Sequence, residues 1–177
     1  MKVELKQYNS KWPELFEQEK TFLLEEIGGF LVGSVEHVGS TAVPGMVAKP
    51  IIDIMFGVES LESSKGAIEV LQKNGYCYYP YKSDVMHWFC KPSPELRTHH
   101  LHLVPYQSPL WKERTRFRDI LRENPKVAEE YRLLKQSLAA EMASDRESYT
   151  QSKWPFCQWP SILTHVWPLI LTHRTSS

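Results

Sequence analysis

Apolar side chains recur at helical spacing near the start of the chain. The segment from residue 10 or 11 to Ile27 places Leu15, Phe16, Phe22, Leu23 and Ile27 on one stripe. Pro13 suits the first turn of such a helix, and Gly28-Gly29 ends it. This pattern predicts an amphipathic helix.

Two strands are predicted next, separated by a turn and a tight connection. Residues 34–38 lead into the turn-forming group Gly39-Ser40-Thr41, and Pro44-Gly45 marks the connection. The run 51–56 is rich in β-branched residues and holds a single acid, Asp53. Its composition predicts a buried strand that carries one carboxylate.

Helical and strand patterns then alternate along the chain. Helices are predicted over 60–74, 108–123 and 125 to about 146, the last with Leu133, Leu134 and Leu138 on its apolar face. Strands are predicted over 76–81, 85–91 and 99–104. This order indicates an α/β (α+β) fold, a mixed sheet flanked by helices, with C-terminal helices after it.

The pattern changes near the end of the chain. From residue 148 onward there is no acid, and this segment holds three of the six tryptophans and the prolines Pro155, Pro160 and Pro168. Such proline spacing argues against a regular helix. We therefore expect one domain over 1–153 and an aromatic tail over 154–177, which wraps over the domain or is partly ordered. Exposed, its rings would form an apolar patch typical of an interface, including one between copies of the chain.

The composition is that of one ordinary folded domain. Of 177 residues, 42% are hydrophobic and 24% are charged, and 21 basic residues balance 21 acidic ones. A net charge of zero gives no general attraction to nucleic acid, and no apolar stretch fits a signal peptide or a transmembrane helix. The scattered Cys77, Cys90 and Cys157 suggest free thiols in a reducing compartment. We expect a cytoplasmic protein without membrane or nucleic-acid partners.

The first candidate site joins the turn after residue 38 to the acid of the next strand. Glycine lets the chain approach a phosphate closely, and the N–H groups of Gly39, Ser40 and Thr41 can form an anion cradle. The carboxylate of Asp53 could hold a divalent cation that bridges the same phosphates. Gly39-Ser40 could equally be a plain turn, but an acid inside an apolar strand costs free energy unless it is paired or binds a metal.

A second candidate site is the histidine pair on a later strand. His100 and His102 are two residues apart and so share one face of the predicted strand. They could bind a metal or a phosphate, or one of them could act as a general acid or base. The alternative is a pair of hydrogen-bonded strand histidines.

These residues lie within motifs that resemble one known family. The segment His37-Val-Gly-Ser-Thr-Ala-Val-Pro-Gly-Met-Val-Ala-Lys-Pro-Ile-Ile-Asp53 resembles the signature of the GrpB family (UPF0157). Further motifs of that family follow in order at 100–104, 117–122, 124–125, 131–135 and 149–153. The resemblance covers roughly residues 5 to 153. It implies the nucleotidyltransferase superfamily fold, and related domains occur fused to dephospho-CoA kinases.

The chain departs from the general nucleotidyltransferase pattern at one position. Active members of that fold place a second acid two residues after the first, and here that residue is Met55. Metal-dependent transfer needs at least two carboxylates around the ions, so further ligands would have to come from Glu36 or from His100 and His102. His102 is the candidate for the place of the third acid. Imidazole ligands suit Mn²⁺ or Zn²⁺ better than Mg²⁺.

Basic and aromatic residues elsewhere could contact a ligand. Lys49 could reach a phosphate or be solvated, and Arg118 could clamp a phosphate or belong to a salt-bridged helix face. His37 could point into the cleft or pack. The pairs Tyr131 and Lys135, and Tyr149 and Lys153, are each four residues apart and so share a helix face.

Three functions stay open on these grounds. The first is a metal-dependent nucleotidyl or phosphoryl transferase that uses Gly39 and Ser40 for phosphate and Asp53 with His102 for the metal. The second is a binding module for a nucleotide or other phosphorylated small molecule that has lost the chemistry, as Met55 suggests. The third is a partner-binding protein that uses the aromatic tail.

Overall fold

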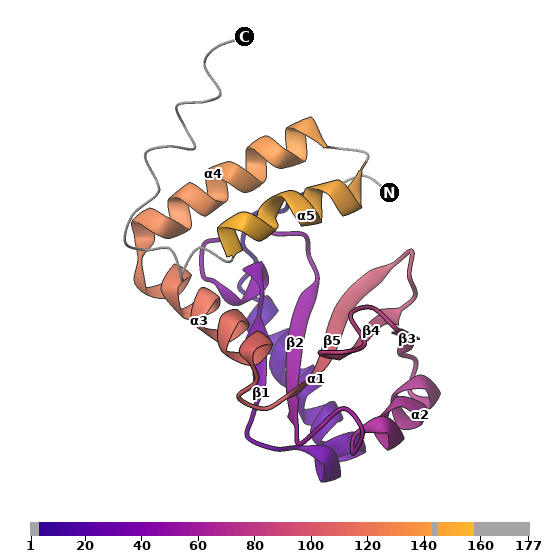
Figure 1. The fold of residues 1–177 in the computed structure, drawn as a ribbon. Helices are drawn as coiled ribbons and strands as arrows, with labels where there is room; N and C mark the ends of the chain where they lie inside the picture. The colour runs from indigo at the N-terminus through magenta and orange to yellow at the C-terminus, as the bar shows by residue number, and fades with distance from the viewer. Residues whose placement is uncertain (1–3, 143–144, 158–177) are drawn as a thin grey trace.

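Five strands form one mixed sheet in the order β1-β2-β5-β4-β3 (Figure 1). The structure is a computed structural model and describes residues 4–142 and 145–157. The strands are β1 (Val35–Val38), β2 (Ile52–Val58), β3 (Cys77–Tyr79), β4 (His87–Pro92) and β5 (Arg97–Pro105). The helices are α1 (Trp12–Ile27), α2 (Lys65–Lys73), α3 (Pro109–Glu123), α4 (Pro125–Glu141) and α5 (Arg146–Cys157), with short 3₁₀ turns at Gly28–Phe30 and Ser40–Ala42. The predicted mixed sheet with flanking and C-terminal helices is confirmed.

The strand register determines which residues of the candidate sites meet. β2 and β5 are parallel, whereas β1 pairs with β2 and β4 pairs with β5 in antiparallel fashion. Asp53 lies between Val38 on β1 and His100 on β5, and Met55 lies opposite His102. Since side chains alternate along a strand, Asp53, Met55, His100 and His102 share one face of the sheet.

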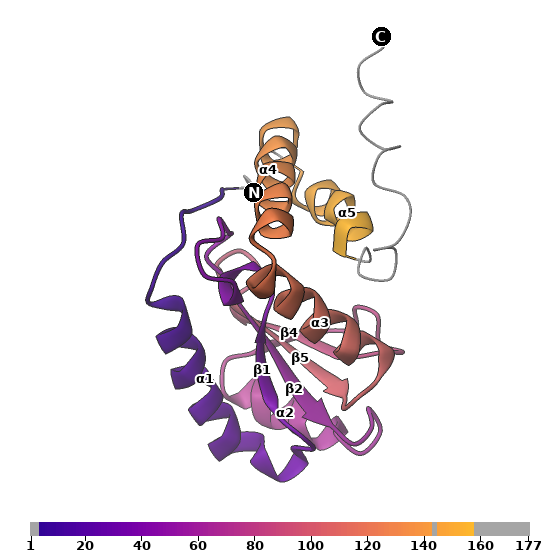
Figure 2. The ribbon, with the colours of Figure 1, turned by 90° about the vertical axis from the view of Figure 1, so that its left-hand side faces the viewer.

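The opposite face carries the main core. Alternate residues of β2, namely Ile52, Ile54 and Phe56, pack with side chains of α1 and α2. Figure 2 shows α1 and α3 on opposite sides of the sheet. Two layers of helices therefore enclose the strands, and the face of Asp53 is the one that α3 partly covers.

The C-terminal helices sit beyond one end of the sheet, next to the turn and connection of residues 39–49 (Figures 1 and 2). Leu121 of α3 and Tyr131 of α4 pack on Val43 and Met46 of that connection. Tyr149 of α5 packs on Leu138 of α4. These contacts hold the connection between β1 and β2 against the C-terminal part of the chain.

Two of the predicted apolar faces need correction. Leu15 on α1 is 40% exposed and Leu133 on α4 is 52% exposed. The buried face of α1 is instead made by Trp12, Phe16, Glu19, Leu23 and Ile27. Glu19 can be buried on this face because its carboxylate receives hydrogen bonds from Tyr76 and from Lys91, each at 2.6 Å.

Two predicted helix boundaries are also wrong. The helix expected from residue 60 begins only at Lys65, because hydroxyls hold the preceding turn: Ser64 donates to the carbonyl of Ser60, and Ser60 accepts from the backbone N–H of Ser63. The helix expected to reach residue 146 ends at Glu141.

A fifth helix was not predicted. α5 continues past Lys153 and through Pro155, against the expectation that prolines exclude a helix there. Pro155 lies in the last turn of α5, where the loss of one backbone donor affects only the helix end. Residues 158–177 of the expected tail lie outside the described part.

Two other sequence expectations concern the membrane and the thiols. None of the helices in the described segments is both long enough and apolar enough to cross a membrane. Cys77 and Cys90, which face each other across β3 and β4, are free thiols. The side chain of Cys157 lies outside the described part.

Candidate functional site

Gly39 makes the turn that ends β1. Its φ of 72° and ψ of −170° fall in a region that is essentially restricted to glycine. A β-carbon at this position would lie 2.5 Å from Oδ2 of Asp53, well inside contact distance. The backbone of the turn therefore passes directly against the Asp53 carboxylate, which only glycine permits.

The Asp53 carboxylate lies beside the two histidines of β5. Nδ1 of His100 donates a hydrogen bond of 2.9 Å to Oδ1 of Asp53. Nε2 of His102 lies 3.9 Å from the same oxygen, which is too long for a hydrogen bond. The structure thus brings Asp53, His100 and His102 together, as parallel pairing of β2 with β5 requires.

The ionisation of this group is set by burial and by mutual contact. Burial alone raises the pKa of Asp53, but the hydrogen bond from His100 and the nearby ring of His102 outweigh burial and hold that pKa well below its usual range. Burial lowers the pKa of His102 to about 4, although Asp53 opposes the shift. At neutral pH the site therefore holds a carboxylate anion beside a neutral imidazole at residue 102.

Both imidazoles have an unused nitrogen. Nε2 of His100 and Nε2 of His102 are buried and make no hydrogen bond to any residue of the described segments. Nδ1 of His102 contacts Sδ of Met86 at 3.3 Å, and sulfur is a weak acceptor. Buried polar atoms without a protein partner usually contact water, an ion or a ligand.

The donors fit a divalent cation only in part. Asp53 and His102 present an oxygen and a nitrogen toward each other, while Nδ1 of His100 is already bonded to Asp53. In residues 4–142 and 145–157, no group of three or more His, Cys, Asp or Glu side chains is arranged to hold a metal ion. Further ligands would have to come from the substrate or from water.

Met55 cannot supply a ligand from where a second acid would stand. Its side chain is 1% exposed and packs with Val38, Met86, Val104 and Trp111 between the sheet and α3. A carboxylate in this apolar cluster would be costly to bury. The packing of α3 on β2 therefore explains why the chain tolerates a methionine here.

The hydroxyls of the turn are used differently. Thr41 is buried, and its Oγ1 donates to the carbonyl of Ile51 at 3.1 Å, so it must accept the 3.0 Å contact from Nε2 of His37. His37 in turn stacks on Phe16 and faces the core. Ser40 is half-buried, and its hydroxyl makes no hydrogen bond within the described part of the chain. Thr41 and His37 thus brace the turn, whereas the Ser40 hydroxyl takes no part in this bracing.

Two lysines from different segments of the chain meet at the ring of Tyr149. Nζ of Lys49 lies 4.8 Å from the centre of the Tyr149 ring, and Nζ of Lys153 lies 4.5 Å from it. Lys135, 1% exposed, donates to the carbonyl of Val47 in the connection before β2. The predicted Lys49 is therefore part of a basic group that α5 completes.

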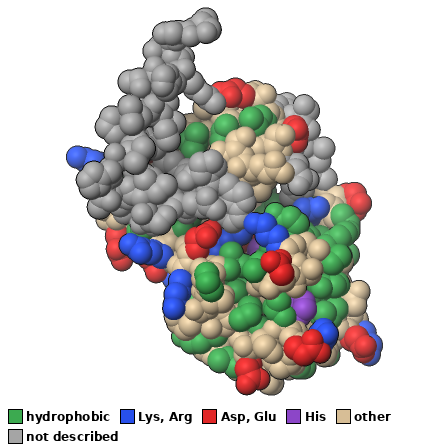
Figure 3. Space-filling model, viewed as in Figure 1, with side chains coloured by type: hydrophobic (Ala, Val, Ile, Leu, Met, Phe, Trp, Pro, Cys, Tyr) green, Lys and Arg blue, Asp and Glu red, His purple; other side chains and the backbone are tan. Residues whose placement is uncertain are grey.

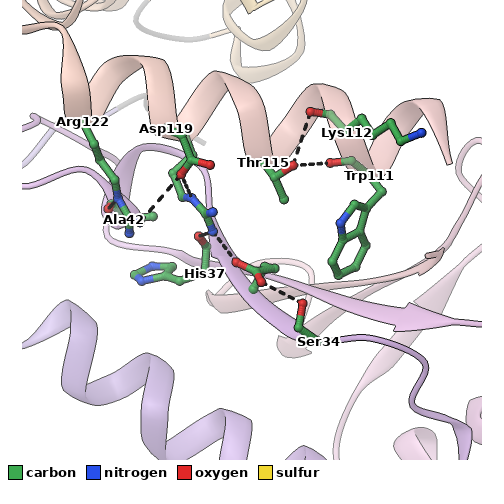
Figure 4. A network of polar contacts seen from close by, with 10 residues as sticks. Ser34, His37, Ala42, Trp111, Lys112, Thr115, Asp119 and Arg122 are labelled. Atoms are coloured by element: carbon green, nitrogen blue, oxygen red, sulfur yellow. Dashed lines mark hydrogen bonds and ion pairs between the residues drawn. The ribbon is translucent and has the colours of Figure 1, made fainter. Parts of the chain in front are cut away.

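Arg118 holds α3 against β1, within the polar network around His37 and Asp119 that Figure 4 draws. Its Nη1 donates to Glu36 at 2.5 Å and to the carbonyl of His37 at 3.0 Å, and its Nε donates to Asp119 at 2.7 Å. Glu36 also accepts from Ser34, so its carboxylate is engaged away from Asp53. A cavity of about 480 Å³ between α1, β1 and α3 borders these groups. Arg118 and Glu36 lie in this network and not beside the histidines.

We expect Arg118→Met to lower the free energy of unfolding by about 2 kcal/mol, because the carboxylate of Glu36 would lose its charged partner in a half-buried site. Denaturant unfolding followed by circular dichroism measures this change. Arg116→Met is the matched control, since Arg116 is exposed on the same helix. Equal stabilities for the two variants would contradict the assigned role of Arg118.

Two residues beside the site were missed by the sequence reasoning. The Trp88 ring lies 5.1 Å from the ring of His100, and the guanidinium carbon of Arg97 lies 5.3 Å from the Trp88 ring. The alternation over 85–91 predicts that Trp88 shares a face with Met86 and Cys90. Nothing in the sequence shows that this strand pairs with β5, so the contact with His100 could not be predicted.

Known proteins share both the sequence and the fold. The family model described as GrpB protein matches residues 2–160. The Glutamate-rich protein GrpB of Alkalihalophilus pseudofirmus is 41% identical over 154 residues, which cover 84% of this chain and 88% of that protein. The UPF0157 protein YqkA of Bacillus subtilis is 36% identical over 152 residues, which cover 86% of this chain but only 44% of YqkA.

A solved structure supports the same assignment. The crystal structure of the conserved protein GrpB from Enterococcus faecalis superposes with a TM-score of 0.81 at 29% identity and covers 90% of this chain and 98% of that one. The family match spans far more than half of the sequence and includes the Gly39 turn, Asp53 and both histidines. This chain therefore belongs to the GrpB family.

Proposed function

We propose that this protein binds a nucleotide or another phosphorylated small molecule, and that its sheet and helices are a nucleotidyltransferase-like fold. The observation that supports the proposal is the close approach of the Gly39 turn to the Asp53 carboxylate, beside two buried imidazoles with unused nitrogens. A glycine turn of this kind lets backbone N–H groups approach phosphate oxygens.

The connection from β1 to β2, together with α5, provides positive charge and hydrogen-bond donors. Ser40 offers a hydroxyl, and Lys49 with Lys153 offers two positive charges on the side of the connection where α5 packs. Positive charge and hydrogen-bond donors together favour phosphate oxygens. Arg118, by contrast, holds α3 in place in this proposal and does not clamp the ligand.

Asp53 and His102 would hold a divalent cation that also contacts the phosphates. The gap of 3.9 Å between Oδ1 of Asp53 and Nε2 of His102 lets both atoms contact one ion, and the imidazole favours Mn²⁺ or Zn²⁺ over Mg²⁺. A bound cation would neutralise the phosphates and orient them for nucleotidyl or phosphoryl transfer. Asp53 and His102 would then be the catalytic residues, with His100 orienting the carboxylate.

Binding without transfer is the second candidate, and Met55 favours it. A centre with one carboxylate lacks the acid pair that clamps two ions in transferases, and the buried Met55 leaves no room for another acid on β2. Incubation with a labelled nucleoside triphosphate separates the two candidates. Turnover that disappears in an Asp53→Asn variant would support transfer, and binding without turnover would support the second candidate.

A thermal-shift screen of nucleoside triphosphates with Mg²⁺, Mn²⁺ or Zn²⁺ tests the proposal. A ligand present at 100 times its Kd should raise the free energy of unfolding by about 2.7 kcal/mol. Asp53→Asn should abolish this gain because it removes the anion from the site. Glu69→Gln is the matched control, since Glu69 is exposed on α2 across the sheet. The absence of any ligand-dependent shift in the wild-type protein would contradict the proposal.

A further inference from the structure

Part of the Asp53 face of the sheet is left open beyond α3. On this face Asp53, His100, Cys90 and Cys77 form one row across the strands, and Met55, His102, Trp88 and Tyr79 form the next. α3 packs over the Met55 end of these rows. At the other end Tyr79 is 37% exposed and Tyr81 is 49% exposed. On this side of the molecule hydrophobic and basic side chains lie exposed next to one another (Figure 3).

The open part is lined by aromatic rings. The Trp88 ring lies 5.8 Å from that of Tyr79 and 6.4 Å from that of Tyr81. Trp88 also contacts His100, whose Nδ1 bonds to Asp53. We call Tyr79, Tyr81, Trp88 and Arg97 the aromatic platform. It is continuous with the Asp53 site through His100.

Arg97 completes the platform with unused donors. An irregularity between Lys91 and Pro92 brings Arg97 onto this face, where its guanidinium lies over Trp88. Its Nε donates to the carbonyl of Pro94 at 2.9 Å. Its two terminal nitrogens make no hydrogen bond and no ion pair within the described residues. The Trp88 ring and the Pro94 carbonyl thus hold the guanidinium in place, and its two terminal nitrogens present parallel hydrogen-bond donors.

The distance between Asp53 and Trp88 matches the separation between the phosphates and the base of a nucleotide. Trp88 on β4 lies two strands from Asp53 on β2, which is about 10 Å at the usual strand spacing. A ribose and its phosphates can bridge this separation. Phosphates at the Asp53 site would then leave the base over the platform.

We propose that the aromatic platform binds a nucleobase, and that Arg97 makes it prefer guanine to adenine. This inference rests on the proposed function of the Asp53 site. Any of the bases can stack on aromatic rings, whereas two parallel donors match the O6 and N7 acceptors of guanine. Adenine presents one acceptor and one donor on the same edge, so it cannot accept both hydrogen bonds.

Calorimetric titration with GTP, ATP and inorganic tripolyphosphate in the presence of Mn²⁺ tests the inference. Tripolyphosphate carries the phosphates without a base. The wild-type protein should bind GTP at least about tenfold more tightly than ATP. Arg97→Met should remove this preference, and Tyr81→Ala or Trp88→Leu should weaken both nucleotides. All three variants should bind tripolyphosphate as the wild type does, and Arg116→Met is the matched control for the lost charge.

Each outcome distinguishes this inference from the proposed function. If GTP, ATP and tripolyphosphate bind alike and no platform variant changes their affinities, the platform is not a base site although the Asp53 site still binds phosphate. If Arg97→Met weakens tripolyphosphate as much as GTP, Arg97 contacts phosphate and the inference is wrong. If none of the three compounds binds the wild type, the proposed function fails and this inference fails with it. Tyr81→Ala keeps the test valid if Trp88→Leu fails to fold, because Tyr81 lies outside the strands.

Discussion

Replacing Gly39 with alanine is expected to lower the free energy of unfolding by about 3 kcal/mol, because two costs add at this position. The backbone conformation of Gly39, with φ of 72° and ψ of −170°, is one that L side chains rarely adopt. The new β-carbon would also lie 2.5 Å from the Asp53 carboxylate and force it away from the turn. Urea unfolding of the purified variant measures the loss.

Two other glycines separate these costs. Gly45 has φ of +77°, but a β-carbon added there would meet nothing within 4 Å, so Gly45→Ala should show only the conformational cost of about 1–2 kcal/mol. Gly28 has neither positive φ nor a close neighbour, and Gly28→Ala should change stability little. Equal losses for Gly39→Ala and Gly45→Ala would mean that Asp53 does not press against the turn.

The second large effect is a loss of stability in mild acid that depends on His37. Burial first, with Arg122 and Arg118 adding to it, lowers the pKa of His37 to about 4, although Asp53 opposes the shift. The unfolded chain takes up the proton near pH 6.5, so between pH 6.5 and 4 it binds more protons than the folded state. The free energy of unfolding is therefore highest above pH 6.5 and decreases as the pH drops. At pH 5 the decrease due to His37 alone is about 2 kcal/mol.

The His37→Gln variant isolates this contribution. Glutamine can still donate a hydrogen bond to Thr41 but does not titrate, so the variant should lose less stability than the wild type between pH 7 and pH 5. The comparison is made by urea unfolding at several pH values. Parallel stability curves for the two proteins would show that His37 is not the group protonated on unfolding.

Local patterns were enough to find the centre of the candidate site. The glycine turn before a β-branched run with one acid predicted that Gly39 and Asp53 would lie near each other, and the register of β1 with β2 brings them together. The spacing of His100 and His102 predicted a shared face. Their position beside Asp53 depends on parallel pairing of β2 with β5, which comes from the tertiary fold and which no local pattern predicts.

Other features could not be predicted because they depend on distant partners. From the sequence alone, Glu19 would be placed on the surface of α1. Only the tertiary fold brings Tyr76 and Lys91 to its carboxylate. Arg118 was a candidate phosphate ligand, but an acid 82 residues earlier in the chain, Glu36, binds it. The proline pattern excluded a helix that nevertheless forms, because packing of Tyr149 on Leu138 supports α5.

The most direct measurement of the central claim is a histidine ring ¹⁵N NMR titration. The protein has seven histidines, and His100→Gln and His102→Gln variants assign the two resonances of interest. Addition of Zn²⁺ and a nucleoside triphosphate should shift the ring nitrogens of His100 and His102, while His87, whose Nε2 contacts the carbonyl of Leu61 on the other face, should stay unchanged. If saturating amounts of both leave His100 and His102 unshifted, Asp53 and these histidines are not a ligand site.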